Sequence, residues 1–174
     1  MRILLVVGRK KRGKTTLVER LVPEFKGRGY KVGSIKYTTG DHVFDVPGKD
    51  SFRHAQAGAE STLILSPHKI AFFSNHLLGE DTEELLGFLF KGYDLIIGEG
   101  FRDCPYPKIE VMVSSHDQPP LCTPKDNLIA IVCDEKINVP VPVFSTNQIR
   151  ELVDHVEKRL KEGGQEIGED NCRE

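Results

Sequence analysis

A phosphate-binding pattern lies near the beginning of the sequence. Residues 8–15 read Gly-Arg-Lys-Lys-Arg-Gly-Lys-Thr and match G-x-x-x-x-G-K-[ST]. The glycines of this pattern let consecutive N–H groups face a phosphate, the lysine reaches the terminal phosphates, and the threonine hydroxyl binds Mg²⁺. We therefore predict a nucleotide site that contains Gly8, Arg12, Gly13, Lys14 and Thr15, with Lys14 also a candidate catalytic residue. The alternative, a glycine turn before an amphipathic helix, leaves the lysine and the threonine unexplained.

A magnesium site in such a loop also needs an acidic side chain. Glu99 follows the apolar residues 94–98 directly and is the first candidate for a catalytic, metal-linked acid. A capping glutamate is the alternative role for this residue. Asp45 is the second metal candidate and lies in the aperiodic segment 37–48. The basic residues at 9–12 are either solvated loop tips or a source of positive potential for an anionic ligand.

The elements around these residues alternate between strands and helices. Residues 2–7 form a short apolar run, typical of a strand buried on both faces, and helical spacing of apolar residues follows from Lys14 to Lys26. A helix over 82–91 would turn Leu85, Leu86, Leu89 and Phe90 inward. We expect further strands at 31–36, 94–98, 128–133 and 141–144, an edge strand at 108–113, a hairpin from 61–65 and 69–73, and further helices at 49–57 and 146–160.

This alternation predicts the α/β class, with a three-layer P-loop NTPase fold, a mostly parallel sheet and a small β-hairpin extension. Sites in such sheets lie beyond the carboxyl ends of the strands. We expect residues 1–162 to form one nucleotide-binding domain and the Gly- and Glu-rich residues 163–174 to form a flexible tail.

Composition excludes several classes of protein. The chain has 174 residues and a formal net charge of −2, which argues against a general nucleic-acid or membrane binder. No apolar run approaches the length of a membrane span, and the charges after the first apolar run are unlike those of a signal peptide. We therefore expect a cytoplasmic protein. The four cysteines form no C-x-x-C pair, which favours a reduced chain with scattered thiols, and a metal or disulfide role is the alternative.

Several segments together resemble the molybdopterin-guanine dinucleotide biosynthesis protein B (MobB) family. Besides the phosphate-binding pattern, the chain has Ile35-Lys36, Phe44-Asp-Val-Pro-Gly-Lys-Asp-Ser-x-Arg53, Ala57-Gly-Ala59, Glu99-Gly-Phe-Arg102 and Pro107-Lys-Ile-Glu-Val111, in this order. The resemblance covers residues 1 to about 150. The D-x-P-G-K-D-S and E-G-F-[KR]…P-K-I-E-V segments are far more specific than the phosphate-binding pattern alone.

The resemblance implies a homodimeric P-loop GTP-binding protein with Mg²⁺ and weak GTPase activity. It implies an adaptor for the guanylyltransferase MobA, with molybdenum-insertion proteins as further candidate partners. By this likeness Gly13, Lys14, Thr15 and Thr16 hold phosphate and Mg²⁺, and Glu99 is linked to the metal. Lys49, Asp50, Ser51 and Arg53 would form a surface toward a second subunit or toward molybdopterin, a further candidate ligand. A helix cap is the alternative role for Asp50 or Ser51.

The chain departs from the family after Ile35-Lys36, where histidines are usual. Here those positions hold Tyr37, Thr39 and Gly40, with His42 nearby, so a metal or pterin role for the histidines is in doubt. The guanine-binding motif N-K-x-D is also missing, so a preference for guanine rests on the resemblance. Asp134, after an apolar strand, could accept hydrogen bonds from guanine, or it could be a capping or turn residue.

Two other functions share the same residues. A kinase that transfers a γ-phosphoryl group to a small molecule would need the same phosphate-binding loop and an acceptor pocket, which the segment 37–54 could supply. A metal-delivery GTPase would need a His/Cys cluster with metal-ligand spacing, and the sequence shows none.

Overall fold

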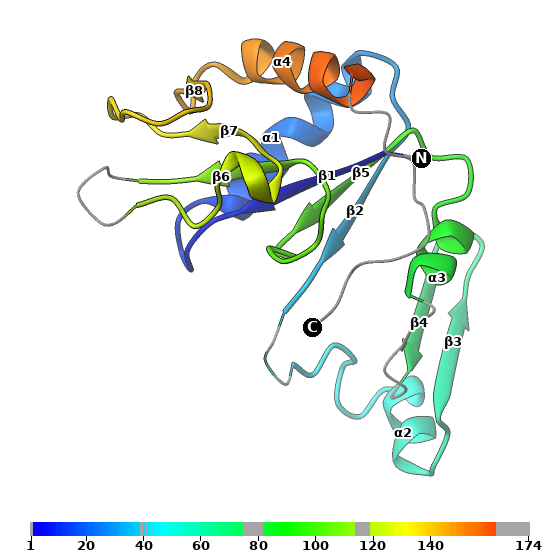
Figure 1. The fold of residues 1–174 in the computed structure, drawn as a ribbon. Helices are drawn as coiled ribbons and strands as arrows, with labels where there is room; N and C mark the ends of the chain where they lie inside the picture. The colour runs from blue at the N-terminus through cyan, green and yellow to red at the C-terminus, as the bar shows by residue number, and fades with distance from the viewer. Residues whose placement is uncertain (1, 39, 41, 75–81, 114–118, 163–174) are drawn as a thin grey trace. The chain divides into compact units, whose positions relative to one another are not determined.

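A parallel sheet of six strands organises the first of two compact units of the chain. The computed structural model describes residues 2–38, 40, 42–74, 82–113 and 119–162. Unit 1 comprises Met1–Thr38 and Leu85–Glu174, and unit 2 comprises Thr39–Glu84. The sheet has the order β2-β5-β1-β6-β7-β8, with every neighbouring pair parallel (Figure 1). Its strands are β1 (Arg2–Val7), β2 (Val32–Lys36), β5 (Leu95–Glu99), β6 (Lys108–Val111), β7 (Leu128–Val132) and β8 (Val143–Phe144).

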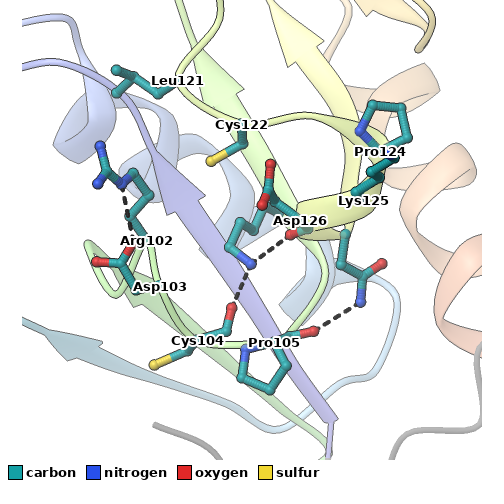
Figure 2. Close-up of a pocket in the computed structure, with 11 residues that line it drawn as sticks. Arg102, Asp103, Cys104, Pro105, Leu121, Cys122, Pro124, Lys125 and Asp126 are labelled. Carbon is teal, nitrogen blue, oxygen red and sulfur yellow. Dashed lines mark hydrogen bonds and ion pairs between the residues drawn. The ribbon is translucent and has the colours of Figure 1, made fainter. Parts of the chain in front are cut away.

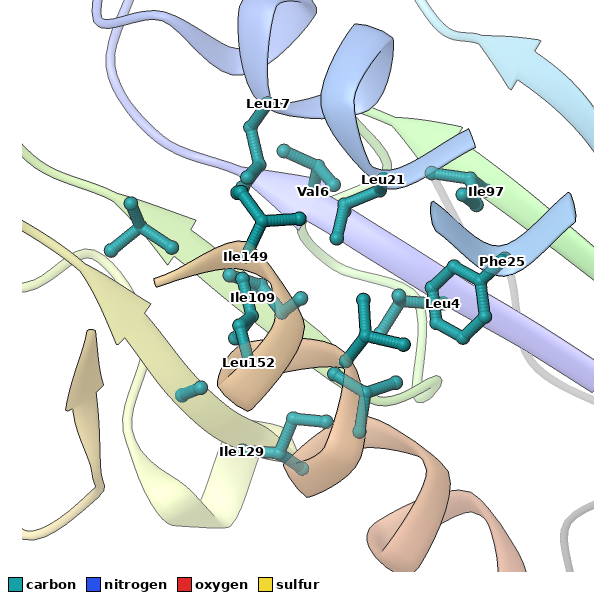
Figure 3. Packing of buried hydrophobic residues seen from close by; sticks show 14 of the residues in the cluster. Leu4, Val6, Leu17, Leu21, Phe25, Ile97, Ile109, Ile129, Ile149 and Leu152 are labelled. Atoms are coloured by element: carbon teal, nitrogen blue, oxygen red, sulfur yellow. The ribbon is translucent and has the colours of Figure 1, made fainter. Parts of the chain in front are cut away.

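Two long helices cover one face of this sheet. Helix α1 (Lys14–Gly27) and helix α4 (Ile149–Glu162) contact each other and place their apolar residues over β1 and β7 (Figure 3). Leu4 and Val6 of β1 point into this layer because alternate side chains of a strand share a face. Phe25 of α1 and Leu152 of α4 are fully buried there. The predicted helix at 14–26 and the strand at 2–7 are confirmed.

The opposite face is covered mainly by loops. Ile3, Leu5 and Val7 of β1 pack there with Ile96 and Ile131, beneath segments that include Cys104 and Cys122. The short 3₁₀ helix η1 (Pro124–Asp126) lies just before β7, whose first residue is Leu128. The α/β class and the mostly parallel sheet are as predicted, but helices α1 and α4 both lie on the same face.

The strand at 108–113 was predicted as an edge strand, and this prediction is wrong. Strand β6 lies between β1 and β7, and all four of its residues are buried. Its alternation of polar and apolar residues is real, but the polar side chains Lys108 and Glu110 are buried rather than exposed to water. Strand β6 therefore has no free edge that could pair with a second chain.

Helix α3 (Thr82–Leu89) ends earlier than the predicted helix. Leu85, Leu86 and Phe90 are partly buried, but Leu89, predicted to point inward, is 51% exposed. Because the helix ends at Leu89, Phe90 lies in the following turn, where its ring stacks edge-on with Tyr93 and lies close to Gly33. No described helix has the length and the apolar character that crossing a membrane requires.

Unit 2 contains helix α2 (Asp50–Gln56) and the strands β3 (Ser61–Leu65) and β4 (Ile70–Ser74). The two strands form the predicted antiparallel hairpin, and α2 contacts β3. The two units are compact groups of contacting residues. Such units are not necessarily separate domains, so the single domain 1–162 stays a prediction. The predicted tail at 163–174 lies outside the described residues.

Candidate functional site

The loop between β1 and α1 has the backbone conformation that a phosphate-binding turn requires. Gly8 and Gly13 have φ angles of 142° and 89°, which side chains rarely adopt. A Cβ atom at Gly8 would lie 2.6 Å from the carbonyl oxygen of Val111, so the loop passes against the end of β6. Gly13 is the N-cap of α1, and no side chain accepts a hydrogen bond there from the first turn of the helix. The N–H groups of that turn can therefore bind a ligand.

Lys14 is folded back across this loop. Its ammonium group donates hydrogen bonds to the carbonyl oxygens of Gly8 (3.0 Å) and Arg9 (2.9 Å). The amine therefore lies within the turn formed by the loop residues, as expected for a residue that binds the phosphate held there. Both bonds are to backbone carbonyls, and an anion bound in the turn would compete with them for the ammonium group.

Thr15, Glu99 and Lys36 form a chain of polar contacts at the carboxyl edge of the sheet. The Thr15 hydroxyl donates to one carboxylate oxygen of Glu99 at 2.9 Å, and the Lys36 ammonium lies 3.3 Å from the other. The Glu99 side chain is 13% exposed, whereas that of Lys36 is 63% exposed. A hydroxyl and a carboxylate are hard oxygen donors, so the pair fits Mg²⁺.

The backbone around Glu99 is fixed on both sides. The Tyr37 N–H donates to the Glu99 carbonyl at 2.9 Å, and the Gly100 N–H donates to Val6 at 3.1 Å. Gly100 has a φ of 99°, and a Cβ atom there would lie 3.2 Å from the Tyr37 carbonyl oxygen. The rings of Tyr37 and Phe101 pack at 5.1 Å. These contacts hold the Glu99 carboxylate in place beside the loop.

A cavity of about 320 Å³ adjoins the loop at the ends of β6 and β7. Arg12, Gly13 and Thr16 line it on the loop side, with Asp134 and Thr146 opposite. The Asp134 carboxylate accepts the Thr146 N–H at 2.7 Å and the Thr146 hydroxyl at 3.0 Å. Asp134 thus joins the ends of β7 and β8, the turn role that the sequence left as an alternative.

The remaining predicted site residues lie in unit 2. Ser51 is buried, and its hydroxyl donates to the Asp45 carboxylate at 2.9 Å. The same Asp45 oxygen accepts the N–H of Val46, so Asp45 closes a local turn. The N-cap of α2 is Lys49, without a side-chain bond, so the alternative role of helix cap does not apply to Asp50 or Ser51. Arg53 is largely exposed and lies 3.9 Å from Asp50.

A larger cavity, of about 700 Å³, lies on the loop-covered face of the sheet (Figure 2). Lys108, which is 1% exposed, lies at this cavity and donates to the carbonyl oxygens of Cys104, Tyr106 (3.2 Å) and Asp126 (2.6 Å). Its three protons therefore have three backbone acceptors, and burial lowers the pKa of its ammonium group. Lys108 thus has a structural role at this cavity, where it joins the loop at 104–106 to the loop before β7.

Glu110 has a matching role two residues further along β6, on the same face of the strand as Lys108. It is 2% exposed, and its carboxylate accepts the N–H groups of Leu121 (2.8 Å) and Cys122 (3.1 Å). Burial, and secondly the charge of Glu110, raises the pKa of the Cys122 thiol to about 11. The thiol is therefore protonated at neutral pH, which makes it a poor nucleophile and a poor metal ligand.

Unit 1 thus brings together Gly8, Gly13, Lys14, Thr15 and Glu99, with Arg12 and Thr16 at the adjacent cavity. Lys36 was not among the predicted site residues, although it stands at the end of a predicted strand, where site residues gather. Arg20 and Thr146 were not predicted as site residues either. Both line the cavity at Arg12 and Thr16, and the Arg20 guanidinium donates a hydrogen bond to the Thr146 carbonyl oxygen.

Comparisons with known proteins found relatives of similar sequence. A family model described as MobB, molybdopterin guanine dinucleotide synthesis protein B, matches residues 3–134. The molybdopterin-guanine dinucleotide biosynthesis adapter protein of Escherichia coli (strain K12) is 34% identical over 151 residues, which cover 83% of this chain and 85% of that protein. A putative adapter protein of the same name from Methanocaldococcus jannaschii is 33% identical over 144 residues, or 80% of this chain and 58% of that one.

Solved structures have the same fold. The crystal structure of Bacillus subtilis MobB matches with a TM-score of 0.72 and 27% identity, covering 95% of this chain and 100% of that chain. A crystal structure of molybdopterin-guanine biosynthesis protein B matches with a TM-score of 0.69 and 27% identity, covering 91% and 99%.

Proposed function

The chain belongs to the MobB family, and from this premise we propose that it is a nucleotide-binding adapter in the synthesis of molybdopterin guanine dinucleotide. The relatives are named as adapter proteins of that synthesis. An adapter acts together with partner enzymes, and a guanylyltransferase of the MobA type is the partner we propose. Molybdenum-insertion proteins are the second class of partner that we propose.

The nucleotide we propose is GTP with Mg²⁺. One observation carries this proposal: the Thr15 hydroxyl and the Glu99 carboxylate are 2.9 Å apart, at the edge where the phosphate-binding loop begins. In this arrangement the threonine oxygen can bind Mg²⁺ while its O–H still donates a hydrogen bond to the carboxylate. Lys14 and the N–H groups of the loop would then hold the β- and γ-phosphates. Asp45 stays a second candidate for the metal.

The cavity at Arg12, Thr16 and Asp134 is the place we propose for the nucleoside, because it adjoins the loop directly. Asp134 is held there by Thr146, so its carboxylate has a fixed position. Guanine presents N–H donors that a carboxylate can accept, whereas adenine presents an acceptor at the equivalent ring nitrogen. A preference for GTP over ATP follows from this chemistry.

Unit 2 supplies the residues that we propose for molybdopterin or for a subunit contact. Lys49, the N-cap of α2, and Arg53, in its last turn, are exposed cations suited to the phosphate of a pterin. Asp50 flanks them with its side chain 92% exposed. Ser51 differs, because its buried hydroxyl donates a hydrogen bond to Asp45. It would therefore support the structure of this surface and not bind the ligand itself.

We also propose a homodimer in which the hairpin of unit 2 contacts a second copy of the chain. Leu63 pairs in register with Phe72, and Leu65 with Ile70, so these four side chains share one face. Each is between 50% and 73% exposed. A two-stranded hairpin is marginally stable alone, and an exposed apolar face of this kind favours association with a matching face.

Analytical sedimentation tests this dimer. The double variant Leu65→Ser/Phe72→Ser should be monomeric. The control variant Val43→Ser, which changes another exposed apolar residue of unit 2, should stay dimeric.

The first experiment is thermal stabilisation by GTP and by ATP, with and without Mg²⁺. A ligand that binds only the folded state raises Tm by mass action. We expect a large Mg²⁺-dependent shift with GTP, a smaller shift with ATP, and no shift with GTP in Lys14→Ala. The variant Lys10→Ala, with an exposed lysine of the same loop, should respond like the unmodified protein. An equal or larger shift with ATP would instead favour the kinase.

A further inference from the structure

Lys36 stands at the same edge of the sheet as the phosphate-binding loop. It is the last residue of β2 and the register partner of Glu99, the last residue of β5. Strand β5 lies next to β1, which leads directly into the loop. The side chain of Lys36 therefore begins two strands away from the loop, on the side where Glu99 and Thr15 meet.

The contact between Lys36 and Glu99 can be released easily. The Lys36 side chain is 63% exposed, and its only hydrogen-bonding or ionic contact described is the 3.3 Å ion pair with Glu99. Solvent-exposed lysine ion pairs contribute little to stability. The other oxygen of Glu99 is already bound to the Thr15 hydroxyl, so the carboxylate keeps its place when the lysine leaves.

Magnesium would change the balance of charge at this point. A divalent cation at Thr15 and Glu99 would repel a neighbouring ammonium group and attract the carboxylate more strongly. The terminal phosphate of a metal-bound nucleoside triphosphate would be the nearest new anion. A flexible lysine stem allows the ammonium to move to it, because the four methylene groups are not packed in the core.

We propose that Lys36 binds the terminal phosphate of a Mg²⁺–nucleoside triphosphate, and that Glu99 holds it only while the metal is absent. Lys36 would then distinguish triphosphate from diphosphate, because its contact would be with the γ-phosphate alone, whereas Lys14 and the loop N–H groups would hold the β-phosphate as well. This inference rests on the nucleotide site proposed above.

The test compares the affinities of a non-hydrolysable GTP analogue and of GDP, both with Mg²⁺, by titration calorimetry. In Lys36→Met the Kd of the triphosphate analogue should rise by about 10-fold or more, as expected for loss of a charge-assisted contact, while the Kd of GDP should change by less than about 3-fold. Lys36→Arg keeps the charge and should retain most of the discrimination. Lys31→Met is the matched control, because Lys31 precedes the same strand and lies 4.4 Å from the ring of Tyr93 instead.

Equal losses of affinity for both nucleotides in Lys36→Met would overturn the inference and show that Lys36 only supports Glu99. Unchanged affinities would overturn it as well. If the unmodified protein binds neither nucleotide, the proposed function fails, and this inference fails with it. Binding of both nucleotides with an unaltered ratio in Lys36→Met refutes the inference alone.

Discussion

Thr15 Oγ1 lies 2.9 Å from Glu99 Oε2, although 84 residues separate them in the sequence. The contact joins the first turn of α1 to the end of β5, which is the sheet neighbour of β1, the strand that leads into α1. The parallel arrangement of β1 and β5 places both residues at the same edge. A magnesium site of two residues can therefore be formed by the backbone topology before any ligand is present.

Replacing Glu99 by Gln should weaken the dependence on magnesium more than it weakens nucleotide binding. The amide keeps the size of the side chain but loses the negative charge that Mg²⁺ needs. We expect the Mg²⁺ concentration that gives half-maximal nucleotide-dependent stabilisation to rise by about 10-fold. Magnesium titrations followed by Tm measure this value.

The control for this variant is Glu19→Gln, which removes an exposed carboxylate from α1. Its magnesium titration should overlay that of the unmodified protein. If the Glu99→Gln titration overlays it too, Glu99 is not linked to the metal.

Replacing Gly8 by Ala should destabilise the fold and impair nucleotide binding together. The new Cβ atom would lie 2.6 Å from the Val111 carbonyl oxygen, and the φ of 142° is strained for alanine. We expect a loss of about 2 kcal/mol in the free energy of unfolding, measured by denaturant titration. Gly27→Ala, at the end of α1 with no atom within 4 Å of the added Cβ, should change stability little. Equal stabilities for the two variants would contradict the geometry of the loop.

The phosphate-binding loop could be predicted from the sequence because its signal is local. The residues at 8–15 fix the turn, and the apolar run before it and the helical spacing after it fix the strand and the helix. Glu99 could be found because a charged residue directly after a buried strand of an α/β sheet must lie at the binding edge. Lys36 obeys the same rule, but its pairing with Glu99 depends on the strand order, which the sequence does not state.

The environment of β6 could not be predicted. Polar residues at alternate positions usually indicate a strand with one face in water. Here Lys108 and Glu110 point into a layer of loops whose backbone groups they bind, and those loops come from residues 104–106 and 121–126. Only the tertiary structure supplies these partners, so the pattern indicated an edge strand although the strand is central.

Replacing Lys108 by Met should destabilise the protein by about 3 kcal/mol. Methionine fills the space but donates no hydrogen bond, which leaves the carbonyl groups of Cys104, Tyr106 and Asp126 without their partner. Lys125→Met, at an exposed lysine of the same cavity, should stay within about 0.5 kcal/mol of the unmodified protein. Denaturant titration of both variants measures the difference. Similar values for the two would show that the carbonyl groups find other partners.

The turn before β7 should lose stability in acid through Asp126. Its carboxylate accepts the hydroxyl of Thr123 at 2.7 Å and the N–H of Thr123 at 2.8 Å, and these two hydrogen bonds lower the pKa of Asp126 in the folded protein. The unfolded chain binds that proton first, at a pKa of about 3.9. The stabilisation is therefore present above that value and is lost as the pH falls through the lower pKa of the folded state. We expect the difference in unfolding free energy between the unmodified protein and Asp126→Asn to be constant from pH 5 to 7 and to shrink toward pH 2. Thr123→Val, which removes the hydroxyl and keeps the N–H, should reduce this pH dependence in part. If the difference in unfolding free energy between the unmodified protein and Asp126→Asn does not vary with pH, the turn does not stabilise the ionised carboxylate of Asp126.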